Sequence, residues 1–241
     1  MKSLFLTPPS PHITQMLRLT PLLLAALYGF VLYRFSAWRT ARELDAKSSL
    51  LADARLNRLT CRMAESLDLP RIRVHIYEVA PINGLAAPDG RIFITRGFYE
   101  KYTSGDVTAE EMASVIAHEL GHVALGHSRR RMIDFSGQNA LRTALAMVLN
   151  RFLPGFGGHV AGFLTTLLAA RISRSDEFEA DAYATALLIK SGIGTEAQKS
   201  LFRKLPSLTG SAGAMPAWLL SHPKSEVRIK AIEKNEKRWL G

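Results

Sequence analysis

The chain has 241 residues, of which 47% are hydrophobic, and it carries 31 Lys or Arg against 21 Asp or Glu. This length suits one folded domain with an appendage, and the hydrophobic share lies at the upper end of the globular range. Cys61 is the only cysteine, which excludes a disulfide-stabilised fold, and the formal net charge of +10 predicts attraction to nucleic acid or to an anionic membrane surface.

Residues 19–35 are predicted to form a membrane anchor that follows a tail of residues 1–18. The anchor contains an apolar run of about fifteen residues between Arg18 and Arg34, and both arginines can reach the membrane interface. A secretory signal peptide is the alternative, but no small-x-small cleavage site follows the run. More Lys and Arg residues follow the apolar run than precede it. This favours a cell (inner) membrane protein whose domain, residues 36–241, is cytoplasmic, with a periplasmic domain as the alternative.

The first part of the domain alternates between helix and strand signals. Apolar residues recur at helical spacing from residue 52 to residue 67, which predicts an amphipathic helix within residues 44–69 that ends before Pro70. Alternating residues predict a half-buried strand over 71–77. The stretch "PINGLAAPDGRIFIT" then predicts a loop, a Pro-Asp-Gly turn and a second strand over 91–95. His75 lies on the polar face of the first strand, so we expect a surface residue and not a metal ligand.

The stretch "HELGHVALGH", residues 118–127, has the spacing of a metal site on a helix. A capping box predicts that this helix starts after residue 108. His118 and His122 are four residues apart and therefore face the same side, whereas Glu119 is rotated from His118 by about 100°. This is the His-Glu-x-x-His zinc pattern, in which the two histidines bind the metal and the glutamate acts as general base.

His127 is predicted not to bind the metal. It lies about 140° further round the helix than His122. A metzincin site would need a glycine at Leu125 and a histidine at Ser128, and neither is present. We expect His127 to end the helix beside three arginines, where positive charge complements the helix dipole.

A catalytic zinc needs a third protein ligand, and the candidates are His159, His222 and a carboxylate. The stretch "SRSDEFEAD" is the best candidate because an N-cap at residues 173–176 predicts a helix with Glu177 in its first turn and Asp181 one turn later. One of these carboxylates can bind the metal while the other accepts a hydrogen bond from a histidine ring. The spacing does not settle which ligand is used.

The segment between the two motifs, residues 131–172, is predicted to return the chain to the same site. It is too short for two membrane spans with turns, and one span would separate Glu177 from His118 by a bilayer. We expect an apolar helical hairpin that is buried against the domain or lies on the membrane. His159, within this segment, is expected to be a core or interface residue.

Together these motifs resemble the gluzincin metallopeptidases of the HtpX and CAAX prenyl endopeptidase type (peptidase family M48). The family signature Ser-Arg-x-x-Glu-x-x-Ala-Asp is matched in order, which implies that Glu177 is the third zinc ligand and Asp181 its structural partner. "NGLAAPDGRIFITRGF" resembles the family's Asn-Ala-Phe-Ala-x-Pro-Gly-Gly-x-Ile stretch, although Gly84 and Asp89 depart from it. "SHPKSEVR" resembles its Thr-His-Pro…Arg element. The resemblance covers roughly residues 45–235.

The resemblance implies an α+β, zincin-like fold, mostly helical, with a small sheet beside the metal-bearing helix. Arg91–Thr95 would be an edge strand that pairs with an extended substrate peptide. The substrate contacts expected on this basis are Asn83, Ile92, Phe93 and Ile94.

The predicted function is zinc-dependent hydrolysis of peptide bonds, in the quality control of membrane-associated proteins. One Zn²⁺ per chain would be held by His118, His122 and Glu177, with Glu119 as general base. His222 is the expected oxyanion donor, and Arg228 is expected to orient or assist it. The expected partners are a protein or peptide substrate, bound as an extended strand, and the lipid bilayer. The oligomeric state is left open.

Two other functions remain as alternatives. One is a zinc-binding chaperone or assembly factor with weak or vestigial peptidase activity, against which the intact Glu119 argues. The other is a basic protein of nucleic-acid or membrane surfaces that carries the motif by accident. No nucleic-acid-binding motif is found, so we expect no nucleic-acid partner.

Overall fold

The computed structural model describes residues 27, 30, 31, 34, 35, 38, 39, 41–87, 89–127, 142, 145, 146, 148–152, 155–208 and 225–240. The side chains of residues 165, 167–172 and 225 are not among those described. The chain divides into two compact units, Met1–Arg42 and Glu43–Gly241. In the first unit the described residues are helical, and the Arg42 guanidinium stacks on the Trp38 ring at 4.5 Å.

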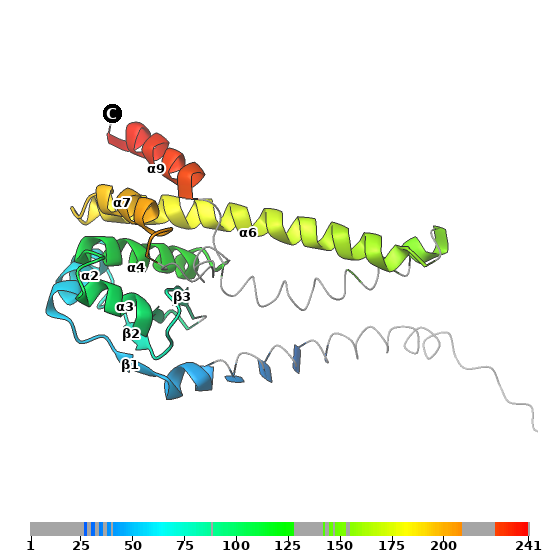
Figure 1. Ribbon diagram of the computed structural model, residues 1–241, viewed down its shortest axis with the longest axis horizontal. Coiled ribbons are helices and arrows are strands. Elements are labelled where there is room, and N and C mark those ends of the chain that lie inside the picture. The colour runs from blue at the N-terminus through cyan, green and yellow to red at the C-terminus, as the bar shows by residue number, and fades with distance from the viewer. Residues whose placement is uncertain are drawn as a thin grey trace, which may run out of the picture. The chain divides into compact units, whose positions relative to one another are not determined.

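The second unit contains a small sheet and several helices (Figure 1). In chain order the elements are β1 (Ser48–Leu50), α2 (Ala54–Ser66), β2 (Val74–Tyr77), β3 (Gly84–Ala86), β4 (Ile92–Thr95), α3 (Arg96–Thr103), α4 (Ala109–Ala124), α6 (Gly157–Lys190), α7 (Glu196–Lys204) and α9 (Ser225–Leu240). The mostly helical α+β fold expected from the sequence is confirmed.

The sheet has the strand order β1-β2-β4-β3, so β4 is a central strand. It pairs in parallel with β2 on one side and antiparallel with β3 on the other. The prediction that Arg91–Thr95 is an edge strand is therefore wrong. Ile92, Phe93 and Ile94 are fully buried, and a substrate strand cannot pair with β4 because both of its edges are taken. The three residues of β3, which the sequence suggested were part of a loop, take the edge position.

The helix predicted before Pro70 is shorter than its pattern suggested. Asp53 caps α2 by accepting hydrogen bonds from the backbone N–H groups of Arg55 and Leu56, and the helix buries Leu56 and Met63. The expected extension towards residue 44 is wrong because residues 48–50 pair with β2 as an antiparallel strand. Strand pairing in the folded domain overrides a helical pattern at the end of a segment.

Helix α4 lies at the centre of this unit, where α2, α6, α7 and the sheet all pack against it. Nearly every residue from Glu111 to His122 is buried. The predicted capping box is present, since Thr108 accepts from the Glu111 backbone and Glu111 accepts from the Thr108 backbone. Glu111 also accepts hydrogen bonds from Ser200 and Lys204 of α7, at 2.6 and 3.0 Å, which fixes the start of α4 against α7.

Helix α6 is continuous over 34 residues. The predicted helix start at Ser173 and Asp176 is therefore wrong, because both residues lie inside α6. Asp176 is 1% exposed and faces the His127 ring, at 3.7 Å, so packing against α4 outweighs its capping preference. The predicted return of the chain to the site is confirmed, since α6 brings Glu177 beside α4. Residues 131–141 of the expected hairpin lie outside the described residues.

In the part of the chain that the structure describes, no helix is both long and apolar enough to cross a membrane. Most of the predicted anchor, residues 19–35, lies outside that part, as does the whole of the tail, residues 1–18. The anchor and the boundaries of the domain at 36–241 therefore stay predictions.

Candidate metal centre

Two helices supply a group of three buried side chains that are placed to bind a metal. His118 and His122 come from α4 and Glu177 from α6, and their ligand atoms all lie within 4.8 Å of one another. The two Nε2 atoms are 3.1 Å apart, and the Glu177 carboxylate oxygens lie 3.3 Å from His118 and 3.4 Å from His122. The residues predicted from the two separate motifs thus meet at one point.

A glycine within the motif lets the two helices approach this closely. A Cβ added at Gly121 would lie 3.0 Å from the Ala180 carbonyl oxygen and 3.3 Å from the Tyr183 side chain. A larger residue here would push α6 away from α4 and lengthen the distance from Glu177 to the histidines. Glycine weakens a helix interior, so its presence in "HELGH" has a packing reason.

The second ring nitrogen of His118 is held by a buried ion pair. His118 Nδ1 lies 3.0 Å from Asp181, and Arg228 binds both Asp181 oxygens at 2.6 Å. Asp181 and Arg228 are each 1% exposed, and the Arg228 guanidinium also stacks on Phe202 at 4.3 Å. The contact holds a proton on His118 Nδ1 and turns Nε2 towards Glu177, where this nitrogen can bind a metal once it has lost its own proton.

This environment also controls the protonation of His118. Burial alone would lower the pKa of His118, but hydrogen bonds to Asp181 and Glu177 raise it to about 9. Burial would raise the pKa of Asp181, yet Arg228 and His118 hold it below its ordinary value. A metal ion at His118 must therefore displace a proton at neutral pH, so metal binding weakens as the pH falls.

His127 is buried against the metal-binding group instead of standing at an exposed helix end. Gly126 has φ of +72°, which ends α4 and turns the chain back. His127 is 0% exposed, and its Nδ1 lies 3.0 Å from His122 Nδ1. His127 follows the end of α4, where it was expected, and its ring is buried against His122. The three arginines expected beside it lie outside the described residues, and its exclusion from the metal ligands stays a prediction.

Glu119 lies next to the edge strand of the sheet. It is 3% exposed, and a Cβ added at Gly84 of β3 would stand 3.2 Å from Glu119 Oε1. The side chain therefore lies against β3, and Glu119 is the neighbour of the ligand His118 on α4. A carboxylate beside a metal-binding group and the edge strand of the sheet is suited to proton transfer.

The donor set fits zinc. Two neutral imidazole nitrogens and one carboxylate oxygen are the ligands of many catalytic zinc sites, which leave a coordination position for water. Acceptors on the second ring nitrogens, here Asp181 for His118 and His127 for His122, are the usual support of such ligands.

The other predicted site residues lie elsewhere. His75 is partly buried on β2, where it stacks on Phe93, and burial followed by the charges of Arg91 and Arg73 lowers its pKa. His159 is exposed on α6, which excludes a core residue, and an interface residue stays the prediction. Asn83 precedes β3 and donates its backbone N–H to Thr95 Oγ1. His222 lies outside the described residues.

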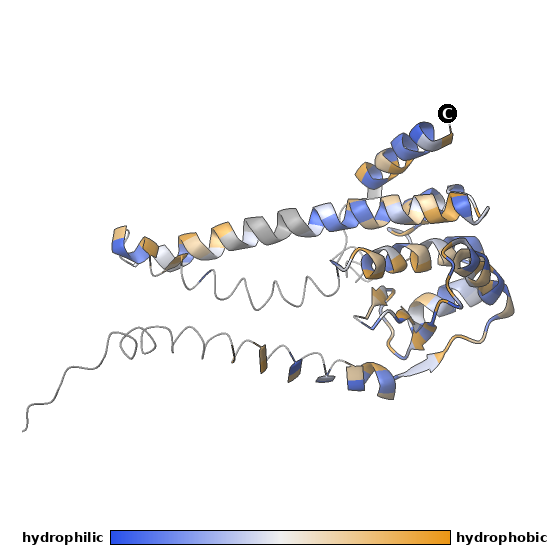
Figure 2. Cartoon of the chain, turned by 180° about the vertical axis from the view of Figure 1, so that it is seen from behind, coloured by the Kyte–Doolittle hydropathy of each residue, from blue (hydrophilic) through white to orange (hydrophobic). Residues whose placement is uncertain are grey.

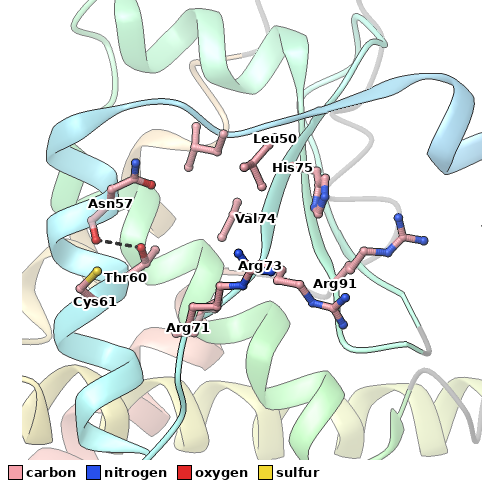
Figure 3. Close-up of a pocket in the computed structure, with 11 residues that line it drawn as sticks. Leu50, Asn57, Thr60, Cys61, Arg71, Arg73, Val74, His75 and Arg91 are labelled. Atoms are coloured by element: carbon pink, nitrogen blue, oxygen red, sulfur yellow. Dashed lines mark hydrogen bonds between the residues drawn. The ribbon is translucent and has the colours of Figure 1, made fainter.

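A cavity of about 570 Å³ opens beside β1 and α2 (Figure 3). It is lined by Leu50, Leu51, Asn57, Thr60, Cys61, Arg71, Ile72, Arg73, Val74, His75 and Arg91. None of the metal-binding side chains takes part in it. The geometry of the three ligands, and not this cavity, therefore locates the candidate active site.

Two contributions to the site were missed in the sequence. The expected direction of His127 assumed that the helix continues past residue 124, but the chain turns at Gly126. A glycine after the last helical turn is the signal that could have shown this helix end. Glu179 also contacts His127, at 3.3 Å. Its position in "DEFEAD" gave no signal, because it is not aligned with Glu177 and Asp181 on an ideal helix.

Comparison with known proteins gives a consistent result. The family model described as "Peptidase family M48" matches residues 50–236. The chain is 27% identical over 208 residues to the metalloprotease LoiP of Escherichia coli (strain K12), covering 80% of this chain and 76% of LoiP. It is 28% identical over 193 residues to the metalloprotease YcaL of the same organism, with coverages of 80% and 73%. A protease HtpX homolog of Salinibacter ruber is 26% identical over 245 residues, with coverages of 88% and 85%.

Proposed function

Because the chain belongs to peptidase family M48 and is a metalloendopeptidase, we propose that it uses zinc and cleaves membrane-associated proteins, with Glu119 as general base. The observation that carries this proposal is the convergence of His118, His122 and Glu177 on one buried point. Glu119 and the edge strand β3 lie beside this group. The arrangement combines three side chains that can bind a metal, a base and a place for an extended chain.

When bound by His118, His122 and Glu177, zinc would supply Lewis-acid chemistry, polarising a carbonyl group and making water more acidic. Glu119 takes the proton of the attacking water and passes it to the leaving amine. Its buried position beside Gly84 excludes bulk water and keeps the carboxylate in one place. Asp181 and His127 keep the two imidazoles in fixed orientations throughout.

The substrate is expected to bind along β3 instead of β4. β3 pairs with β4 through Gly84↔Ile94 and Ala86↔Ile92, and among the described residues no strand pairs with its other edge. A peptide that adds to this edge in extended form runs past Glu119, because Gly84 packs against it. Asn83, directly before β3, is placed to meet such a peptide.

Two residues near the end of the chain were expected to stabilise the oxyanion, His222 as donor and Arg228 in support. His222 stays the predicted donor. Arg228 has its described contacts with Asp181 and His118, which supports a role in holding the ligand His118 in place. Holding His118 in place is a different role from the predicted one, in which Arg228 orients His222.

Metal removal tests the proposed function. The purified full chain is expected to contain about one zinc ion per molecule and to digest casein. Treatment with a chelator should abolish digestion, and added zinc should restore it, because the three buried side chains provide the metal site. Metal content is measured by atomic emission, and digestion by release of labelled peptides. Casein digestion that survives complete metal removal would contradict the proposal.

Location at a membrane is supported by the start of α6 and the residues just before it. Phe152, Phe156 and Phe163 are 74%, 69% and 64% exposed, next to the exposed Arg151. Figure 2 shows hydrophobic residues in orange at this end of α6. Exposed aromatic rings beside a cationic side chain are typical of surfaces that enter the membrane interface. We therefore place the chain at the cell (inner) membrane, with the predicted anchor and a cytoplasmic domain, where it acts in protein quality control.

A fluorescent label at position 156 tests this contact. The variant Cys61→Ser/Phe156→Cys, labelled at its single thiol, is reconstituted into vesicles that contain lipids brominated on their acyl chains. We expect several-fold quenching of the dye, because position 156 would lie at the depth of the upper acyl chains. The control is the parent chain labelled at the exposed Cys61 of α2, where we expect little quenching. Equal quenching at both positions, or none at 156, would contradict a membrane-inserted end of α6.

A further inference from the structure

We propose that His127 and Glu179 position the ligand His122 through a chain of hydrogen bonds. The chain runs from the Glu179 carboxylate through the His127 ring to His122 Nδ1. The inference rests on the proposed function, since it takes His122 Nε2 to be the metal-binding atom.

The geometry of this chain is continuous. His127 Nδ1 lies 3.0 Å from His122 Nδ1, and His127 Nε2 lies 3.3 Å from Glu179 Oε2. His127 is 0% exposed and its contact with His122 is buried, whereas the Glu179 side chain is 51% exposed. Ser175 holds the other Glu179 oxygen, with Ser175 Oγ 3.2 Å from Glu179 Oε1.

The direction of each hydrogen bond follows from the metal-binding role of His122. A histidine that binds a metal through Nε2 carries its proton on Nδ1, so His122 Nδ1–H donates to His127 Nδ1. His127 then carries its own proton on Nε2, which donates to Glu179. A carboxylate is the acceptor that this tautomer needs. Each ring in the chain thus has one donor and one acceptor, and both are used.

The same arrangement occurs on the other ligand. Asp181 accepts from His118 Nδ1, at 3.0 Å, and itself lies on α6. Both histidines of α4 are therefore fixed from α6, His118 directly and His122 through the inserted ring of His127. The turn at Gly126 makes this possible, since a straight helix would carry His127 away from His122.

A purely structural role for His127 makes a different prediction. A buried imidazole that only fills space would affect folding stability and leave the metal ligand unchanged. A partner that fixes tautomer and ring orientation affects metal affinity, typically by 10- to 100-fold. Zinc affinity and folding stability of the metal-free chain therefore separate the two roles.

The experiment compares four variants of the full chain by competition for zinc with a chromogenic chelator. His127→Leu and Glu179→Ala are expected to weaken zinc binding by about 10- to 100-fold. His127→Gln, whose amide can still accept from His122, should recover part of the loss. The control Glu100→Ala removes the same carboxylate from an exposed site on α3 and should match the parent. Thermal unfolding of the metal-free proteins is measured in parallel.

A spectroscopic readout accompanies the affinities. In ¹⁵N-histidine-labelled, zinc-loaded parent, the His122 Nδ1 proton should give a slowly exchanging downfield resonance, which His127→Leu should remove. If His127→Leu fails to fold, Glu179→Ala decides the matter, because the Glu179 side chain is 51% exposed and tolerates substitution. Zinc affinities of the variants within twofold of the parent would overturn the inference. A parent that binds no zinc would overturn it together with the proposed function, whereas a parent that binds zinc but cleaves nothing would overturn the proposed function alone.

Discussion

Replacing Glu119 with Gln is expected to lower kcat/KM for peptide cleavage by roughly 10²- to 10⁴-fold while zinc content stays at the parent level. The amide keeps the shape of the side chain but cannot take a proton from water. Glu119 is outside the metal-binding group, so the three ligands are left intact. Cleavage of a fluorogenic peptide and metal analysis of the same preparation provide the measurement.

Glu110→Gln serves as the matched control for this variant. Glu110 lies on the same helix, is partly exposed and pairs with Arg55 at 3.2 Å, so its loss should leave cleavage unchanged. A kcat/KM of Glu119→Gln close to that of the parent would contradict the role of Glu119 as general base. A parent chain that binds zinc but shows no cleavage would instead favour the zinc-binding chaperone or assembly factor.

Replacing Arg228 with Met is expected to lower the free energy of unfolding by about 3–5 kcal/mol. The substitution leaves the Asp181 carboxylate buried without the guanidinium that binds both of its oxygens. Burial of an uncompensated charge is among the few mechanisms that give effects of this size. Urea unfolding of the metal-free chain, with the same slope in parent and variant, measures the loss.

Two further variants complete this test. Arg228→Met/Asp181→Asn removes both charges and should be less destabilised than the sum of the two single variants, because the side chain at position 181 no longer needs the guanidinium as its counter-ion. Arg203→Met removes an exposed partner of Glu196 and should change the free energy of unfolding by about 1 kcal/mol or less. An Arg228→Met chain as stable as the parent would contradict the structural role of this ion pair.

The metal-binding residues could be predicted because their constraints are local. His118 and His122 face the same side of any helix, and the capping box at Thr108 fixed where that helix begins. The position of Glu177 depends on how α6 packs against α4, which spacing cannot give, and the resemblance to known metallopeptidases supplied it.

What the sequence could not predict depends on contacts between distant segments. β3 has three residues and is a strand only because β4 lies beside it, so its pattern resembled a loop and β4 was taken for the edge. Asp176 carries a capping signal, but packing against α4 keeps α6 continuous through it. Glu179 reaches His127 only once the turn at Gly126 has brought His127 back.

Because α6 is one continuous helix, a movement at its first residues is carried along it to Glu177. About twenty residues, or about 30 Å of helix, separate the phenylalanine-bearing end from Glu177, with no proline or bulge to absorb bending. A tilt imposed on the distal end is therefore transmitted along a stiff rod to the oxygen atoms that face the two imidazoles. The tilt of that end and the distance from Glu177 to the two histidines are therefore coupled.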